Sequence, residues 1–138
     1  MPATSEQLIK LRTVNDTVND VPYIADSSMF DEPPDTWKLV PDGKGFVCRD
    51  YVIAKAAELI DQGWSKINLS VVLCYTEPVE GFPNGEYHAV LAADSGDETW
   101  ILDNRYSDIY RWDKPPFPYR WALRQIAGTD GFLDISAA

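Results

Sequence analysis

The sequence is poor in cysteine, histidine and basic side chains, and it has no long apolar run. It contains two cysteines and one histidine in 138 residues. Two cysteines are too few for a disulfide scaffold, so we expect both to be thiols. No stretch approaches the roughly 18 apolar residues of a transmembrane helix, and the N-terminus lacks a basic segment followed by an apolar one. We therefore expect a cytoplasmic protein without a signal peptide.

The charge is strongly one-sided. There are 22 acidic against 12 basic side chains, which gives a formal net charge of −10. Such a charge disfavours nucleic-acid backbones and anionic membranes as partners. The 45% hydrophobic content is enough for a core, and we expect one domain over residues 1–138. Nothing in the composition selects an oligomeric state.

Two segments have helical periodicity. In the first, Thr4 and Gln7 have the spacing of a capping box, and Pro22 ends the helix. The second and clearer helix covers residues 47–62, and Gly63 stands where a left-handed cap is expected. The expected buried positions are Leu8, Leu11, Val14 or Asn15, and Val18 in the first helix, and Val52, Ala56, Leu59 and Ile60 in the second.

The second half of the chain has strand periodicity. Strand-like runs cover residues 66–75, 86–94 and 99–104, with a shorter one at 108–112. A short C-terminal helix is expected around residues 121–127. Helices followed by consecutive strands indicate an α+β fold with an antiparallel sheet.

Between the helices, residues 26–45 are rich in Asp, Pro and Gly and indicate a long loop. Long loops inside domains are often functional. Trp37, in this loop and upstream of Cys48, is our candidate for the wall of a substrate groove.

Cys48 stands at or near the first turn of the second helix, where the helix dipole stabilises a thiolate. It could also be a small apolar core residue or half of a disulfide with Cys74. The single histidine, His88, lies in a strand run, and a hairpin centred between Ser95 and Gly96 would place it opposite Asp103. An aspartate beside an imidazole is the arrangement that fixes a catalytic tautomer, although Asp103 is also an ordinary turn residue at a strand end.

In this order, the segments "VNDTVNDVPYIAD", "DTWKLVPDGKGFVCRDYVIAKAAEL" and "GEYHAVLAADSGDETWILDN" resemble the bacterial transglutaminase-like cysteine proteinases, a branch of the papain-like/transglutaminase superfamily. The resemblance extends over residues 11–119. It implies a nucleophile helix packed on an antiparallel sheet, with Cys48 as nucleophile, His88 as general base and acid, and Asp103 as the residue that orients His88.

The best-known relatives are periplasmic, calcium-dependent proteases that cleave a large surface adhesin. They have Gly-Asp-Cys-Glu-Asp around the nucleophile, whereas this chain has Phe46, Val47, Cys48, Arg49 and Asp50. Arg49 brings a positive charge where a hard cation would bind. We therefore expect no metal and no cofactor, and a compact member of the kind found in bacteriophages.

The resemblance implies a thiol hydrolase that cleaves a peptide or isopeptide bond in a protein or peptide substrate through an acyl-enzyme. Two alternatives stay open. An amine acyltransferase of the transglutaminase type would use the same triad, and a non-catalytic acidic binding or inhibitor module would keep only the fold.

Overall fold

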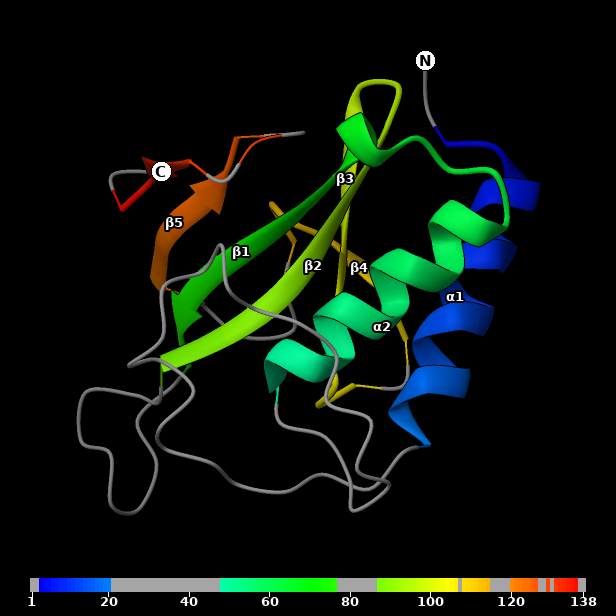
Figure 1. The fold of residues 1–138 in the computed structure, drawn as a ribbon, viewed down its shortest axis with the longest axis horizontal. Coiled ribbons are helices and arrows are strands. Elements are labelled where there is room, and N and C mark those ends of the chain that lie inside the picture. Colours follow the sequence, from blue (N-terminus) through cyan, green and yellow to red (C-terminus); the bar gives the residue numbers. More distant parts are fainter. Residues whose placement is uncertain are drawn as a thin grey trace.

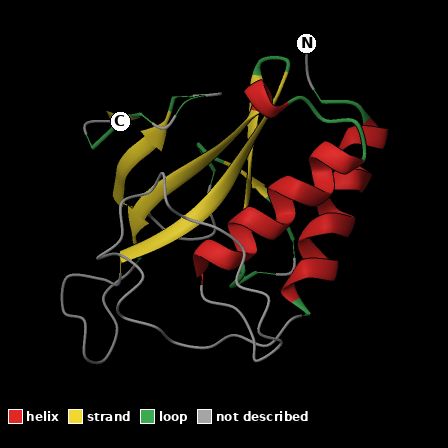
Figure 2. Cartoon of the chain, viewed as in Figure 1, coloured by secondary structure: helices red, strands yellow, loops and turns green. Residues whose placement is uncertain are grey.

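The computed structural model describes residues 3–20, 48–76, 87–106, 108–114, 120–126, 129 and 131–136. Figure 2 shows the arrangement of its helices and strands. The elements in these residues are α1 (Ser5–Asn19), α2 (Cys48–Asp61), the 3-10 helix η3 (Lys66–Asn68), β1 (Leu69–Tyr75), β2 (Tyr87–Ser95), β3 (Glu98–Leu102), β4 (Tyr110–Arg111), β5 (Arg120–Gln125) and β6 (Phe132–Asp134).

The strands form one sheet in the order β4-β3-β2-β1-β5-β6. Each neighbouring pair is antiparallel. Both α-helices lie on the same side of this sheet, with α2 packed on β2 and α1 packed on α2 (Figure 1). The predicted α+β fold with an antiparallel sheet is therefore confirmed.

The N-terminus of α1 is fixed by the capping box that the sequence predicts. The Gln7 backbone N–H donates to Thr4 Oγ1 at 3.1 Å, and the Thr4 backbone N–H donates to Gln7 Oε1 at 2.9 Å. These bonds satisfy two N–H groups that have no partner within the helix. One turn and two turns further on, Leu11 and Val14 enter the core.

Helix α2 begins and ends one residue inside the predicted limits. Two residues after its end, Gly63 has a φ of +101°, and the next N–H, from Trp64, donates to the Leu59 carbonyl at 2.9 Å. Val52 and Leu59 are buried as predicted, but the prediction for Ile60 is wrong, because 44% of it is exposed. Adjacent helical residues point about 100° apart, so Leu59 faces the core and Ile60 faces solvent.

The core lies between the helices and the sheet. Its buried members come from both helices, from β1 to β3 and from the segment after β3; they are Leu11, Val14, Val52, Leu59, Leu69, Leu73, Ala89, Leu91, Ala93, Leu102 and Ile109. A smaller apolar cluster, formed by Val72, Val90, Ala92 and Ile101, occupies the alternate positions of β1 to β3. Because the strands bury alternate residues on both faces, β2 is apolar along most of its length.

The β2–β3 hairpin turns one residue later than we expected. Ser95 pairs with Glu98, which leaves Gly96 and Asp97 as the turn, and Gly96 has a positive φ of 64°. Every partner on β3 is therefore displaced by two residues from the predicted register. Because strand side chains alternate with a period of two, this displacement leaves each residue on its predicted face.

The prediction of a C-terminal helix around residues 121–127 is wrong. Residues Arg120–Gln125 form β5, which pairs with β1, and a further strand, β6, pairs with β5. The segment "RWALRQ" is rich in residues with good helix propensity. Pairing with the exposed edge of β1 overrides that propensity, and local sequence does not reveal it.

In the residues described, no helix is long and apolar enough to cross a membrane.

Candidate active site

The candidate site lies at the open end of the β2–β3 hairpin, away from the turn at Gly96. His88 is the second residue of β2, and Asp103 follows β3 directly. Both are buried, with exposed fractions of 5% and 0%. A buried ionisable pair of this kind is costly unless its members satisfy one another.

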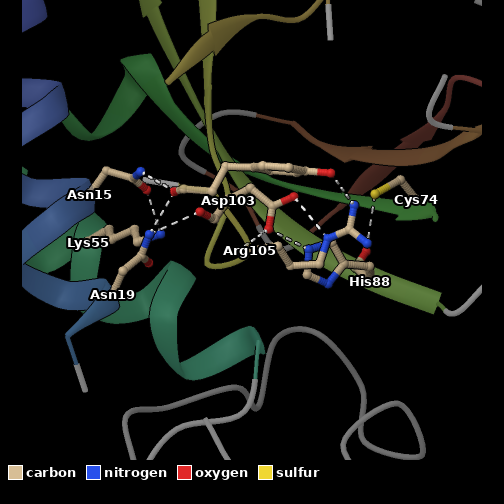
Figure 3. Close-up of polar contacts among 8 residues, drawn as sticks. Asn15, Asn19, Lys55, Cys74, His88, Asp103 and Arg105 are labelled. Carbon is tan, nitrogen blue, oxygen red and sulfur yellow. Dashed lines mark hydrogen bonds and ion pairs between the residues drawn. The ribbon is translucent and has the colours of Figure 1, made fainter. Parts of the chain in front are cut away.

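His88 and Asp103 are in direct contact. The distance from His88 Nε2 to Asp103 Oδ1 is 2.8 Å (Figure 3). Since an ionised carboxylate can only accept, Nε2 carries the proton, and in a neutral imidazole the lone pair would then be on Nδ1. The contact is diagonal, because the ladder continued from Leu91 and Leu102 would place Asp103 opposite Val90.

The Asp103 carboxylate is also fixed from its own chain. Its Oδ1 accepts the Arg105 backbone N–H at 2.9 Å, and Arg105 Nε lies 3.6 Å from Oδ2. The first of these is the local turn contact typical of aspartate after a strand. Asp103 is therefore a turn residue and the partner of His88 at once, through the same oxygen atom.

Cys48 is the first residue of α2 and so lies in the first turn, where it was expected, and its side chain lies outside the part that the structure describes. The first turn of α2 lies at the same end of the sheet as the start of β2 and the end of β3 (Figure 1). Trp37 and the whole of residues 26–45 also fall outside the described residues.

Cys74 is a buried cysteine on β1, opposite His88 in the ladder. Its Sγ lies 3.6 Å from the His88 carbonyl oxygen and donates weakly to it. Cys74 is fully buried, which fits the structural role expected for it.

The structure adds residues that the sequence analysis did not select. Lys55 on α2 has no exposed surface, and its Nζ donates to Asn15 Oδ1 at 2.7 Å. Burial lowers the pKa of Lys55 to about 7, against the opposing effect of the Asp103 and Asp16 carboxylates. A signal was present in the sequence, because Lys55 lies three residues after Val52 and four before Leu59, within the apolar stripe of α2.

The absence of a calcium site stays a prediction from the sequence. The described residues contain no group of three or more His, Cys, Asp or Glu side chains that could hold a metal ion. Of the positions around Cys48, Asp50 carries a carboxylate and is buried, whereas position 49 is an arginine in the sequence. A guanidinium repels a hard cation, so this donor set is unsuited to calcium.

Similar solved structures have the same fold. Legionella pneumophila LapG in its calcium-bound form matches with a TM-score of 0.70 and 23% identity, over 92% of this chain and 68% of that one. EGTA-treated LapG matches with a TM-score of 0.64 and 22% identity, over 94% of this chain and 72% of that one. No curated protein matches the chain.

The sequence also matches a family model described as "Bacterial transglutaminase-like cysteine proteinase BTLCP", over residues 1–135. This match extends beyond the residues 11–119 on which we based the resemblance. The architecture agrees with the expectation from the resemblance, since Cys48 begins a helix that packs on an antiparallel sheet. The chain therefore belongs to the family of bacterial transglutaminase-like cysteine proteinases.

Proposed function

We propose that the protein is a thiol hydrolase whose nucleophile is Cys48, with His88 as general base and acid and Asp103 as the residue that orients His88. The observation that carries this proposal is the buried 2.8 Å contact between His88 Nε2 and Asp103 Oδ1. This contact leaves Nδ1 as the atom that exchanges a proton with the thiol.

The position of Cys48 in α2 supports its role as nucleophile. It begins the helix, where the dipole stabilises a thiolate. Lys55 follows seven residues later, which is nearly two full helical turns, so the two residues lie roughly 20° apart around the axis. The face of α2 that carries Lys55 is the face acted on by the Asp103 charge.

The reaction follows from these roles. His88 Nδ1 takes the thiol proton, and the thiolate attacks the carbonyl carbon of an amide. Backbone N–H groups, including that of Cys48, stabilise the tetrahedral oxyanion. His88 then protonates the leaving amine, which departs and leaves a thioester on Cys48. Water, deprotonated by His88, attacks the thioester, and the acid and the free thiol are released.

The substrate class is a protein or peptide, as the cysteine proteinase family implies. We favour hydrolysis of a peptide or isopeptide bond. Transfer of the acyl group to an amine is the second candidate reaction.

We also propose that residues 1–138 fold as one domain. A bacteriophage origin and a cytoplasmic location stay predictions from the sequence.

Thiol labelling tests the triad directly. We expect iodoacetamide to label Cys48 between about pH 5 and 8, below the ~8.5 pKa of a free thiol, while Cys74 stays protected by burial. Mass spectrometry of the digested protein locates the label. Cys48→Ser provides the matched control, and equal, slow labelling of both cysteines would contradict the proposal.

An activated ester separates the two reactions. With p-nitrophenyl acetate we expect a burst of p-nitrophenolate and an acetyl group on Cys48, visible in the intact mass. The lifetime of this thioester is then measured with and without a primary amine. Turnover by water alone supports a hydrolase, whereas formation of the acetylated amine as the main product supports an acyltransferase. No acetylation of Cys48 would contradict both.

A further inference from the structure

Lys55 is the most unusual side chain in the described part of the protein. It lies in the middle of α2 with no exposed surface, among core residues such as Val52 and Leu59. Removing an ammonium group from water costs several kcal/mol unless partners compensate for it. An apolar side chain of similar length would fill this volume without that cost.

Lys55 has partners on three elements. On α1, Asn15 Oδ1 accepts a hydrogen bond from Lys55 Nζ at 2.7 Å. The exposed Asp16 carboxylate, also on α1, favours the charged form of Lys55 and so raises its pKa. From α2, the Tyr51 ring lies with its centroid 5.8 Å from Nζ. From the turn after β3, the buried Asp103 carboxylate acts on it as well. Asp103 also contacts His88.

Two asparagines of α1 connect this lysine to the turn at residues 103–106. Asn15 Nδ2 donates to the Tyr106 carbonyl at 2.9 Å. Asn19, one turn later, donates from Nδ2 to the carbonyls of Asp103 at 3.2 Å and Tyr106 at 3.0 Å. Figure 3 shows Asn15, Asn19 and Lys55 on one side of Asp103 and His88 on the opposite side.

We propose that Lys55, acting with Asn15, is a positioning residue that holds Asp103 against His88. This inference rests on the function proposed for Cys48, His88 and Asp103. The turn is held at both ends by side chains of α1, and the ammonium of Lys55 holds Asn15 in place while attracting the Asp103 carboxylate. Because Lys55 and Cys48 share one rigid helix, the same element positions both the nucleophile and the orienting carboxylate.

The single histidine makes this proposal measurable. With one histidine in the chain, every imidazole signal in an NMR spectrum of 15N-histidine-labelled protein comes from His88. Such spectra distinguish a proton on Nε2 from a proton on Nδ1. In the parent protein we expect the Nε2–H form to dominate, because Asp103 Oδ1 accepts from Nε2.

The test compares Lys55→Met with the parent. Methionine keeps the length of the side chain and removes its charge and its donors. We expect the ratio of Nε2–H to Nδ1–H forms to fall, and alkylation of Cys48 near pH 6 to fall by roughly threefold to tenfold, less than the ~100-fold that a 1 Å misplacement can cost. Lys66→Met, which removes an exposed ammonium, should change neither quantity.

Asn15→Ala is the second variant, and it carries the test if Lys55→Met does not fold. It keeps the ammonium but removes its acceptor and the bond to the Tyr106 carbonyl. We expect a shift of the His88 tautomers in the same direction and of smaller size. Folding of each variant is checked by circular dichroism and by its urea midpoint.

The outcomes separate this inference from the proposed function. If Cys48 is unreactive in the parent, the proposed function fails, and the tautomer ratio still reports on the positioning of Asp103. If Asp103→Asn alters the His88 signals and folded Lys55→Met and Asn15→Ala do not, the role of Lys55 is overturned. An increase in alkylation of Lys55→Met with unchanged tautomers also overturns it, because Lys55 would then act through its charge alone.

Discussion

Helix α1 contacts the β2–β3 hairpin and the turn after β3 near its two ends, and the two contacts differ in their exposure to solvent. Near its N-terminus, Ser95 donates to Gln7 Oε1 at 2.7 Å and the Ala3 backbone N–H donates to a Glu98 carboxylate oxygen at 2.6 Å. Near its C-terminus, Asn15 and Asn19 bind the turn that carries Asp103. The first contact is partly open to solvent, whereas Asn15 is fully buried.

A cavity lies at the turn end of the hairpin, away from the candidate site. The end of the hairpin at the Gly96 turn borders a polar cavity of about 490 Å³, lined by residues that include Gln7, Gln62 and Ser95. None of Cys48, His88 and Asp103 lines it. Polar groups in that cavity can bind water at little cost, whereas those around Asp103 are buried and bonded to one another. The buried network, which is the more expensive arrangement, therefore marks the site better than the cavity does.

The largest expected effect comes from breaking the buried pair. In His88→Ala we expect Cys48 alkylation near pH 6 to fall by about 100-fold, and in Asp103→Asn by about tenfold, because proton transfer and its orientation each contribute on this order. The rates are measured with iodoacetamide on folded protein. Asp108→Asn is the control, because Asp108 is an exposed carboxylate paired with Arg12. Ser95→Ala tests the other end of the hairpin. Neither Asp108→Asn nor Ser95→Ala should slow the labelling of Cys48.

A pH series on stability tests the buried lysine. The pKa of Lys55 falls from 10.5 in the unfolded chain to about 7 in the folded protein. Between these values the unfolded state binds a proton that the folded state does not, so the contribution of Lys55 to stability rises with pH. The free energy of unfolding of the parent, minus that of Lys55→Met, should therefore increase from about pH 7 toward pH 10. The slope of this difference in unfolding free energy against pH is at most about 1.4 kcal/mol per pH unit.

Urea unfolding of both proteins at each pH gives this difference. Lys66→Met serves as the control, because its ammonium is exposed and no comparable slope is expected. If the difference in unfolding free energy between the parent and Lys55→Met does not change with pH, Lys55 stays fully protonated up to the range of an ordinary lysine. The buried contacts near the C-terminus of α1 would then differ less from the contacts near its N-terminus than we infer.

Stability should also distinguish the two ends of α1. Asn15→Ala removes a buried acceptor and a buried donor, and we expect it to cost about 1–3 kcal/mol of unfolding free energy. Gln7→Ala removes half of the capping box and the acceptor for Ser95 in a more exposed setting, with an expected cost of about 0.5–1 kcal/mol. Urea midpoints measure both values. A larger cost at Gln7 would reverse the comparison.

The smallest expected effect concerns calcium. Since Val47 and Arg49 supply no carboxylate beside Cys48, millimolar calcium or a chelator should leave the melting temperature and the labelling of Cys48 unchanged. Thermal unfolding and iodoacetamide labelling, with calcium and with EGTA, are the measurements. A rise of several degrees with calcium would show that the folded protein binds the ion and would contradict this prediction.

Much of the fold could be predicted because it depends on neighbours in the sequence. The capping box of Thr4 and Gln7, the limits of α2 and the left-handed Gly63 are all set within one helical turn. The His88–Asp103 contact was predictable for a related reason. The hairpin register was wrong by two residues, but the alternation of side chains has a period of two, so the error did not change the faces.

Other features depend on residues far apart in the chain. The segment Arg120–Gln125 has the composition of a helix and becomes β5 because the edge of β1 is available to it. Lys55 could be recognised as an oddity in an apolar stripe, yet its partners Asn15 and Asp103 lie 40 and 48 residues away. The sequence alone thus determined the local elements and the candidate Cys48, His88 and Asp103. Only the tertiary structure decided which buried groups surround Asp103, because burial and charge pairing arise when distant segments pack together.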